Sequence, residues 1–318
     1  MGERAFRWLL LVSVVMTLVG PSRVMAEPLV ILTSPRLEKP LVALAESFEA
    51  MHSDVHIKIL LDSGLGLRGT ISRLQNAGMY GIESGVVHIV APADQQLLDR
   101  LEYRYYVLQG TRRPYATTRL VLVAQADGQG PIESLDDLRR NTTVRVVVAD
   151  PEISELGHRT KSALDQLRWS DAVTDHIIIS HDVRGVLDRI IHRKADTGIL
   201  FEYQAVAAGP SLKIIAPLPE DAAPPVVYAM AMERFCPNRQ LCQAFLDFSQ
   251  SPEARTILAG LGYGVPDESN SLGTETEPVG SNKTEASETH DSAPHSSWWV
   301  RFLDLFRREG TSAPSPTR

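Results

Sequence analysis

IIISHDVRGVLDRIIHRKADTGILF, residues 177–201, contains a complete strand–helix–strand unit. The apolar run 177–179 predicts a buried strand, and a polar turn then precedes a segment with helical periodicity at 183–193. The stretch 197–201 returns to a strand pattern before the next polar residues. A strand joined to the next strand by a helix is typical of an α/β fold with a parallel sheet.

The same alternation extends over residues 28–264. Strands are expected at 29–32, 55–61, 86–91, 120–124, 144–149, 214–216 and 226–232, and helices at 37–48, 67–74, 95–101, 158–167, 240–248 and 252–261. This pattern predicts an α/β fold with mostly parallel sheets flanked by helices.

Two lobes are expected because about 240 globular residues exceed an average domain. Neither an internal repeat nor a Gly/Pro-rich linker interrupts the region, so we expect strands that cross between the lobes. The expected boundaries are 28–117 with 226–264 for a discontinuous first lobe, and 118–225 for the second.

The N-terminus has the pattern of a cleavable signal peptide spanning residues 1–26. Arg4 and Arg7 precede an apolar run over 8–20, and Val24-Met25-Ala26 forms a small-residue cleavage site. An uncleaved anchor is the alternative, but the run is short against the ~20 residues that a membrane-spanning helix needs. The sequence therefore predicts export to the periplasm.

Charge argues against a nucleic-acid partner. Removal of residues 1–26, which hold three arginines and one glutamate, lowers the formal net charge from −7 to −9. Phosphate neutralisation needs clustered Lys and Arg. A small anion is not excluded, since local backbone dipoles can bind one in an acidic protein.

The chain has two cysteines, Cys236 and Cys242. In an oxidising compartment a disulfide between them is expected, with two free thiols as the alternative. No further metal ligands gather near them.

Composition changes after Val265. Residues 265–297 are polar and rich in Ser, Thr, Glu and Pro, which predicts a disordered linker. Residues 298–309 combine aromatic side chains with arginines at helical spacing and predict an amphipathic helix. It would either contact a membrane surface or partner, or dock on its own domain.

Four polar turns between expected strands and helices are the candidate ligand-binding segments. They are Thr33–Arg36, Asp62–Gly66, Ser154–Gly157 and His181–Arg184. Such turns lie at the carboxyl ends of strands, where α/β sheets bind ligands. Helix starts leave backbone N–H groups without acceptors and carry a positive dipole end, so several of them together can bind an anion. Each turn alone would be an ordinary capped helix start.

Over residues 28–264 the chain resembles the periplasmic molybdate-binding proteins of ABC importers, within the wider solute-binding superfamily. The segments that carry the resemblance are Val90–Asp94, Arg119–Val123, Ala149–Glu152 with Gly157, Asp182–Leu187, Ala195–Phe201, Pro224–Ala229, Ala244–Phe248 and Ser251–Ala254. The resemblance implies a two-lobed protein that closes around a tetrahedral oxyanion and delivers it to an inner-membrane permease.

The family's ligand positions carry over in part. Its two serines fall at Arg36 and Gly64, with Ser34 and Ser63 nearby in the sequence. Its backbone donors fall at Leu156 and Val183, and its tyrosine falls at Phe201, with Tyr203 two residues on.

Three hydroxyl groups are thus absent from their expected places. A hydrogen bond to a charged group contributes about 1.5–3 kcal/mol, so their loss without replacement would weaken binding strongly. Either Ser34, Ser63 and Tyr203 substitute, or the ligand has changed. Arg36 would favour another oxyanion or a carboxylate if it faces the cleft. It could instead face solvent or pair with Glu202.

Enzyme and cofactor motifs are weak. Gly64–Gly69 matches G-x-G-x-x-G, but no acidic residue follows the next expected strand. His88, His158 and His181 lack metal-ligand spacing, and no nucleophile elbow occurs. We therefore expect no catalytic residues, no cofactor and no metal, and a protein that is a monomer.

Two functions follow from the sequence. The first is a periplasmic solute-binding protein that captures an oxyanion between its lobes by helix-start N–H groups and hands it to an ABC permease. The alternative is a periplasmic sensor or adaptor with a degenerate pocket, whose C-terminal helix docks on a membrane or partner.

Overall fold

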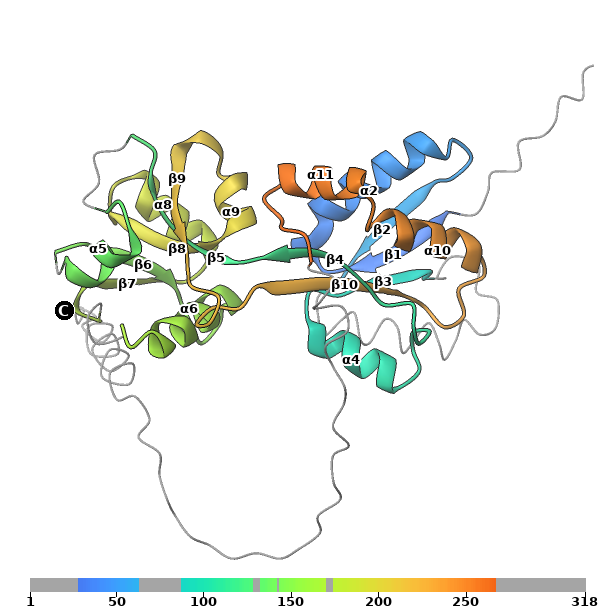
Figure 1. Cartoon of the computed structure of the whole chain (residues 1–318), viewed down its shortest axis with the longest axis horizontal. Coiled ribbons are helices and arrows are strands. Elements are labelled where there is room, and N and C mark those ends of the chain that lie inside the picture. Colours follow the sequence, from blue (N-terminus) through green and yellow to red (C-terminus); the bar gives the residue numbers. More distant parts are fainter. Residues whose placement is uncertain (1–27, 63–86, 128–131, 142, 170–173, 267–318) are drawn as a thin grey trace, which may run out of the picture. The chain divides into compact units, whose positions relative to one another are not determined.

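A computed structural model describes residues 28–62, 87–127, 132–141, 143–169 and 174–266. Their strands form two five-stranded sheets, in the orders β2-β1-β3-β10-β4 and β7-β6-β8-β5-β9 (Figure 1). In each sheet three neighbouring strands are parallel and the remaining pairings are antiparallel. The protein therefore has a two-lobed α/β fold with mixed sheets.

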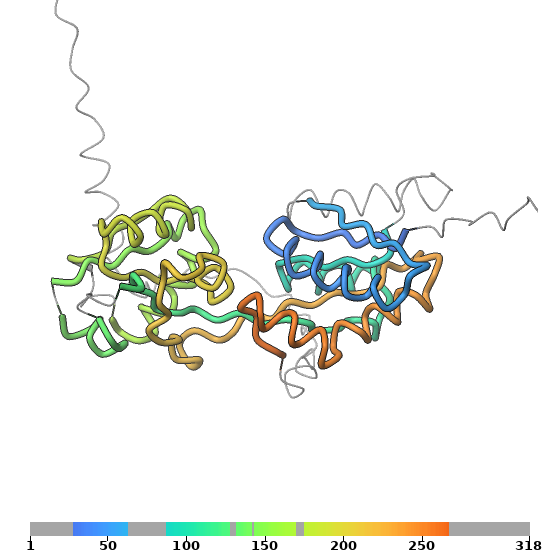
Figure 2. Tube along the Cα trace, turned by 90° about the horizontal axis from the view of Figure 1, so that it is seen from above, coloured from blue at the N-terminus to red at the C-terminus, as the bar shows by residue number. Residues whose placement is uncertain are grey.

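The described residues divide into two compact units. The first comprises Met1–Thr111 with Ala231–Phe248, and the second Arg112–Met230 with Ser249–Arg318, over the described parts of each. The divisions fall at 111–112, 230–231 and 248–249, so that one of them lies within β10; Figure 2 traces the chain through both units. The lobe boundaries expected from the sequence stay a prediction; the units differ from them chiefly because residues 249–264 associate with the second unit.

The first unit contains strands β1 (Leu29–Thr33), β2 (Ile57–Leu61) and β3 (Ile89–Ala91), the 3-10 turn η1 (Pro35–Leu37), and helices α2 (Glu38–Met51), α4 (Gln95–Tyr103) and α10 (Arg239–Phe248). Every side chain of β1 is buried, and this strand is the central one of three parallel strands. α2 and α4 lie on opposite sides of the sheet (Figure 1).

The second unit contains the remaining elements. Its strands are β4 (Arg113–Thr118), β5 (Leu120–Gln125), β6 (Val146–Ala149), β7 (Ile177–Ser180), β8 (Thr197–Phe201), β9 (Leu212–Pro217) and most of β10 (Val226–Met232). Its α-helices are α5 (Leu135–Arg140), α6 (Glu155–Gln166), α8 (Val183–Ile191), α9 (Glu202–Ala207) and α11 (Pro252–Gly260), and two further 3-10 turns are η2 (Thr174–His176) and η3 (Gly209–Ser211). β6 and β8 are buried along their whole lengths, as expected of central strands.

Cys236 and Cys242 form a disulfide in the first unit. Within the part of the chain that the structure describes, no helix is both long enough and apolar enough to cross a bilayer. The expected signal peptide, the G-x-G-x-x-G segment, the linker at 265–297 (apart from its first two residues) and the helix at 298–309 lie outside the described residues.

One ion pair fixes the entry to two central strands. Asp196, just before β8, accepts hydrogen bonds from Arg145, just before β6: from its backbone N–H at 2.8 Å, from Nη2 at 2.8 Å and from Nε at 3.1 Å. The Arg145 guanidinium, through these hydrogen bonds, lowers the pKa of the Asp196 carboxyl below its ordinary 3.8.

This depressed pKa predicts a pH-dependent stability effect. Because the folded-state pKa lies below the unfolded one, the stabilisation is present above pH 3.8 and is lost as pH falls through the folded pKa. Asp196→Asn should lower the free energy of unfolding by about 1 kcal/mol at pH 7, since the pair is partly exposed. Urea denaturation should show this difference shrinking below pH 3.8, and a difference that is constant down to pH 2 would contradict it.

Candidate functional site

Two helix starts meet at one edge of the second sheet. The parallel strands β6 and β7 end at the paired residues Ala149 and Ser180. The next turns are tied together by a hydrogen bond of 2.8 Å from the Asp150 N–H to the Ser180 carbonyl. α6 and α8 begin a few residues beyond these ends. The strand pairing therefore brings the amides of Leu156 and Val183, both expected donors, to the same edge.

The start of α6 is capped and tightly packed. The Ser154 hydroxyl accepts a hydrogen bond of 3.4 Å from the Gly157 N–H. A Cβ atom on Gly157 would lie 2.4 Å from the Ala149 and Asp150 carbonyl oxygens, so the helix rests directly on the end of β6. Leu156 is the second residue of this helix, and its buried aliphatic side chain has no polar atom, so its backbone N–H is the donor it can offer a ligand.

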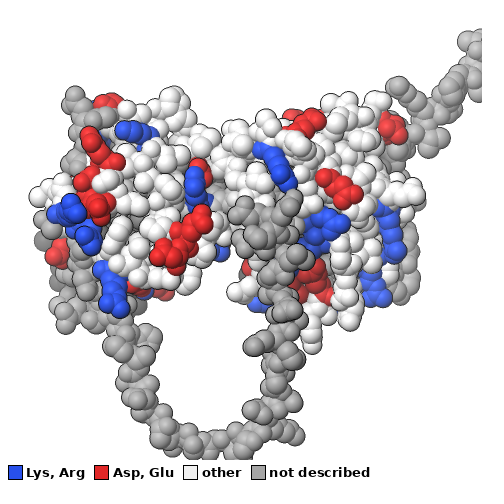
Figure 3. All heavy atoms as spheres, in the orientation of Figure 1, with Lys and Arg blue, Asp and Glu red and all other residues white. Residues whose placement is uncertain are grey.

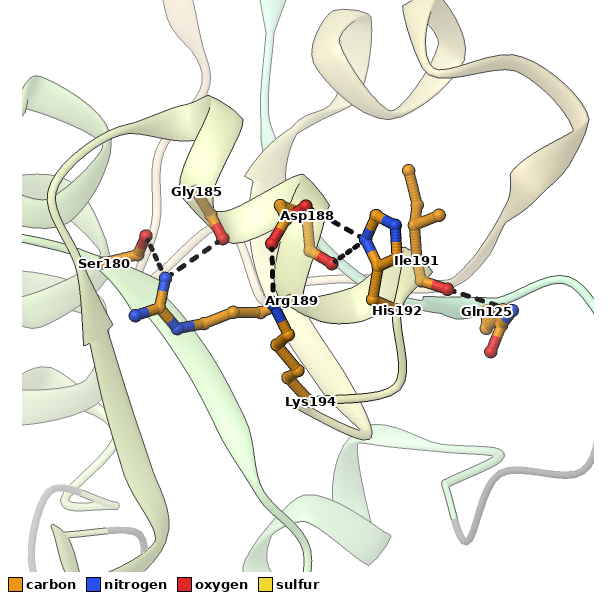
Figure 4. A network of polar contacts seen from close by, with 8 residues as sticks. All are labelled: Gln125, Ser180, Gly185, Asp188, Arg189, Ile191, His192 and Lys194. Carbon is orange, nitrogen blue, oxygen red and sulfur yellow. Dashed lines mark hydrogen bonds and ion pairs between the residues drawn. The ribbon is translucent and has the colours of Figure 1, made fainter.

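The start of α8 is held in a similar way. Asp182 accepts a hydrogen bond of 2.8 Å from the Gly185 N–H. Arg189 reaches back along the helix and donates from Nη1 to the Ser180 hydroxyl at 3.1 Å and to the Gly185 carbonyl at 3.5 Å (Figure 4). Val183 is the first residue of the helix, where a backbone N–H has no acceptor within the helix.

The third strand of this parallel group, β8, ends at Phe201, whose side chain is buried. Tyr203 lies in the first turn of α9, stacked between Phe201 at 6.0 Å and Tyr263 at 4.9 Å between ring centroids. Its hydroxyl accepts a hydrogen bond of 3.2 Å from the Gln204 side chain. α9, which had not been expected from the sequence, thus places the Tyr203 ring in an aromatic stack.

Glu202 is held by Arg119. Nε and Nη2 of Arg119 donate to the two carboxylate oxygens at 2.8 and 3.2 Å, and the Glu202 N–H donates to the Arg119 carbonyl at 3.0 Å. The sequence analysis gave Glu202 as an alternative partner for Arg36. In the structure, both carboxylate oxygens of Glu202 accept hydrogen bonds from Arg119, which lies in the same unit. Sequence reasoning missed the pair because its members lie 83 positions apart.

In the first unit, the predicted residues near β1 also lie at the carboxyl ends of parallel strands. β1 and β2 end at the paired residues Thr33 and Leu61, and Thr33 accepts a backbone bond of 2.9 Å from Asp62. Ser34 precedes η1, and its side chain caps no helical amide. Arg36 is exposed within that turn. Ser63 and Gly64 lie outside the described residues.

A pocket of about 460 Å³ in the second unit does not coincide with the predicted donors. Its walls include Thr118, Arg119, Glu202, Glu220 and Tyr263, but neither Leu156 nor Val183. The Thr118 hydroxyl is buried without a hydrogen-bond partner. We place the candidate site at the α6 and α8 starts because the pocket's guanidinium and nearest carboxylate already neutralise each other.

The sequence analysis considered three histidines as metal ligands, and the structure describes the surroundings of each. His88 is buried in the first unit, where its Nδ1 accepts a hydrogen bond of 3.2 Å from the Val30 N–H. His158 and His181 are exposed in the second unit. Among the described residues, no group of three or more His, Cys, Asp or Glu is arranged to hold a metal ion.

The charged surface shows no single-sign patch on the face in view. Acidic and basic side chains of the described residues are interspersed there (Figure 3). Among the described residues on this face, no broad basic surface is present to attract an anion over a long distance.

Two α/β lobes whose helix starts gather at the carboxyl ends of parallel strands define a ligand-binding protein of the periplasmic type. The chain belongs to the bacterial extracellular solute-binding protein family, whose pattern matches residues 29–264.

Two relatives of this chain are molybdate-binding proteins. The chain is 28% identical to molybdate-binding protein ModA of Escherichia coli K12 over 189 residues, which cover 58% of this chain and 73% of the relative. It is 25% identical to ModA of Haemophilus influenzae over 187 residues, covering 57% and 72%. These relatives are solute-binding proteins rather than enzymes.

Solved structures support the same fold. The substrate-binding domain assigned to a molybdenum ABC transporter of Clostridium difficile aligns with a TM-score of 0.68 at 19% identity, covering 76% of this chain and 99% of that one. The periplasmic molybdate-binding protein of Azotobacter vinelandii gives 0.52 at 20% identity, covering 75% and 100%. The sulfate-binding protein SubI of Mycobacterium tuberculosis gives 0.53 at 16%, covering 76% and 88%.

Proposed function

We propose that this chain is the periplasmic solute-binding protein of an ABC importer and that it binds a tetrahedral, molybdate-like oxyanion. The observation that supports this most is that α6 and α8 begin just beyond the neighbouring ends of the parallel strands β6 and β7, which the bond from Asp150 to Ser180 links. In this arrangement the N–H groups of Leu156 and Val183 would face a ligand at one edge of the sheet, where two helix dipoles favour negative charge.

The family resemblance also assigns ligand positions to the first unit. Ser34 stands at the end of β1 with a side chain that caps no helix, so its hydroxyl is suited to a ligand. Ser63 and the Gly64 amide are proposed as further donors on the family resemblance alone. Arg36 is exposed in the same turn as Ser34, and a guanidinium at this family ligand position would suit an anion.

The proposed ligand is a fully ionised oxyanion. The acidic side chains at these turns already accept backbone hydrogen bonds: Asp150 from Glu152 at 2.9 Å and Asp182 from Gly185 at 2.8 Å. Monohydrogen phosphate must donate its own proton to an acceptor, and molybdate, tungstate and sulfate need donors only. The backbone donors at this edge suit molybdate, tungstate and sulfate directly, whereas phosphate would also need a carboxylate oxygen turned toward its proton.

Calorimetric titration of the mature protein with molybdate, tungstate, sulfate and phosphate tests the proposal. We expect a Kd below about 1 μM for one of the first three anions and binding at least tenfold weaker for phosphate. Absence of binding to all four at millimolar concentration would overturn transport of an oxyanion. If one anion binds, the anion with the lowest Kd would identify the cargo delivered to the permease.

The sensor or adaptor function is the second candidate. The buried Phe201 favours it, because the family's tyrosine hydroxyl is absent there and the Tyr203 hydroxyl bonds to Gln204. It is supported if the titration shows no anion binding while the full chain, but not a chain ending at residue 266, associates with membranes. Membrane contact of residues 298–309 and the monomeric state stay predictions.

A further inference from the structure

We propose that Arg189 is a positioning residue for the anion site, acting through the start of α8. This inference rests on the proposed function, since it concerns how the Val183 amide is held for a ligand. Arg189 lies in the second half of α8, but side chains of a helix point toward its N-terminus, so the guanidinium reaches the first turn.

The guanidinium bridges strand and helix. Nη1 donates to the hydroxyl of Ser180, the last residue of β7, and to the carbonyl of Gly185 in the first turn of α8 (Figure 4). Ser180 is only 2% exposed, so its hydroxyl lies at a fixed point of the sheet. The bridge therefore holds the first turn of α8 against the end of β7.

Gly185 makes this close approach possible. A Cβ atom at this position would lie 2.1 Å from the Ser180 hydroxyl and 3.5 Å from both Arg189 Nη1 and the Asp182 carboxylate. The cation and the carboxylate thus lie against the same residue. Asp182 caps the helix, but its negative charge also repels an anion that approaches the Val183 amide. The Arg189 charge offsets that repulsion where the amide donors lie.

The bridge differs from the other polar contacts of this helix. Asp188 pairs with His192 and Lys194 on the exposed side, and Gln125 donates to the Ile191 carbonyl at the helix end (Figure 4). Those contacts involve the C-terminal half of α8 and its following turn. Among the interactions drawn, Arg189 alone reaches the turn that carries the proposed donors.

The test compares Arg189→Met with Arg193→Met, a matched control. Arg193 is exposed, lies just beyond the end of α8 and pairs with Asp127. Replacing it with Met removes one positive charge, as Arg189→Met does. We expect Arg189→Met to weaken binding of the preferred oxyanion at least tenfold, and Arg193→Met to change it less than twofold. Arg189→Lys, which keeps the charge but loses the fork, should recover part of the affinity.

A second readout needs no ligand. Hydrogen exchange of the Gly185 and Val186 amides in the ligand-free protein should accelerate at least fivefold in Arg189→Met and stay unchanged in Arg193→Met. Equal affinity and equal exchange in the two variants would overturn the positioning role. If the wild-type protein binds no oxyanion, the proposed function fails, while the exchange comparison still decides whether the bridge holds the turn.

Discussion

Gly157→Ala is expected to lower the free energy of unfolding by about 2–3 kcal/mol and to reduce oxyanion affinity at least tenfold. The added Cβ would lie 2.4 Å from the carbonyl oxygens of Ala149 and Asp150. These are backbone atoms at the end of a buried central strand, so they cannot move aside as a flexible side chain would. The start of α6 must shift instead, and the Leu156 amide moves with it.

Gly260→Ala supplies the matched control. Gly260 is the last residue of α11 in the second unit, and a Cβ there meets no atom within 4 Å. Because alanine favours helices over glycine, this variant should be as stable as the wild type or slightly more so. Urea denaturation and calorimetry on both variants check the prediction, and equal behaviour of the two would show that the contact of α6 with β6 is not tight.

Val183→Pro is expected to weaken oxyanion binding by about 10- to 150-fold while leaving the fold intact. The substitution removes a single backbone N–H, and a hydrogen bond from such a group to a charged ligand contributes about 1.5–3 kcal/mol. Proline is tolerated at the first position of a helix, and Pro252 already occupies that position in α11. Asp182, with φ −147° and ψ −179°, has the extended backbone that a residue before proline requires.

Val183→Ala separates the lost donor from the changed side chain. It shortens the side chain but keeps the N–H, so its affinity should stay within about threefold of the wild type. Thermal denaturation should place both variants close to the wild-type Tm. Binding by Val183→Pro that equals binding by Val183→Ala would exclude the Val183 amide as a ligand donor.

Regular, apolar segments were predictable from the sequence. The strands at 197–201 and 226–232 match β8 and β10 at both ends, because alternation and turn residues mark their limits. β4 was missed, since its sequence RPYATT is polar and contains proline, and pairing with β10 makes it a strand. α9 was missed because six residues are too few to show a helical period in the sequence. Its first turn is held by the ion pair of Glu202 with Arg119, which lies far away in the chain.

For the candidate site, too, part was predictable from the sequence and part depended on the tertiary structure. A local rule, that a polar turn after a strand starts a helix with unpaired amides, predicted the turns Ser154–Gly157 and His181–Arg184 along with the α/β class. The choice of Leu156 and Val183 within those turns came from the family resemblance and stays a prediction. Only the tertiary structure decided that α6 and α8 follow neighbouring strands of one sheet, that Glu202 pairs with Arg119, and that Arg189 reaches Ser180. These depend on strand order and on contacts between residues far apart in the chain, which local periodicity does not encode.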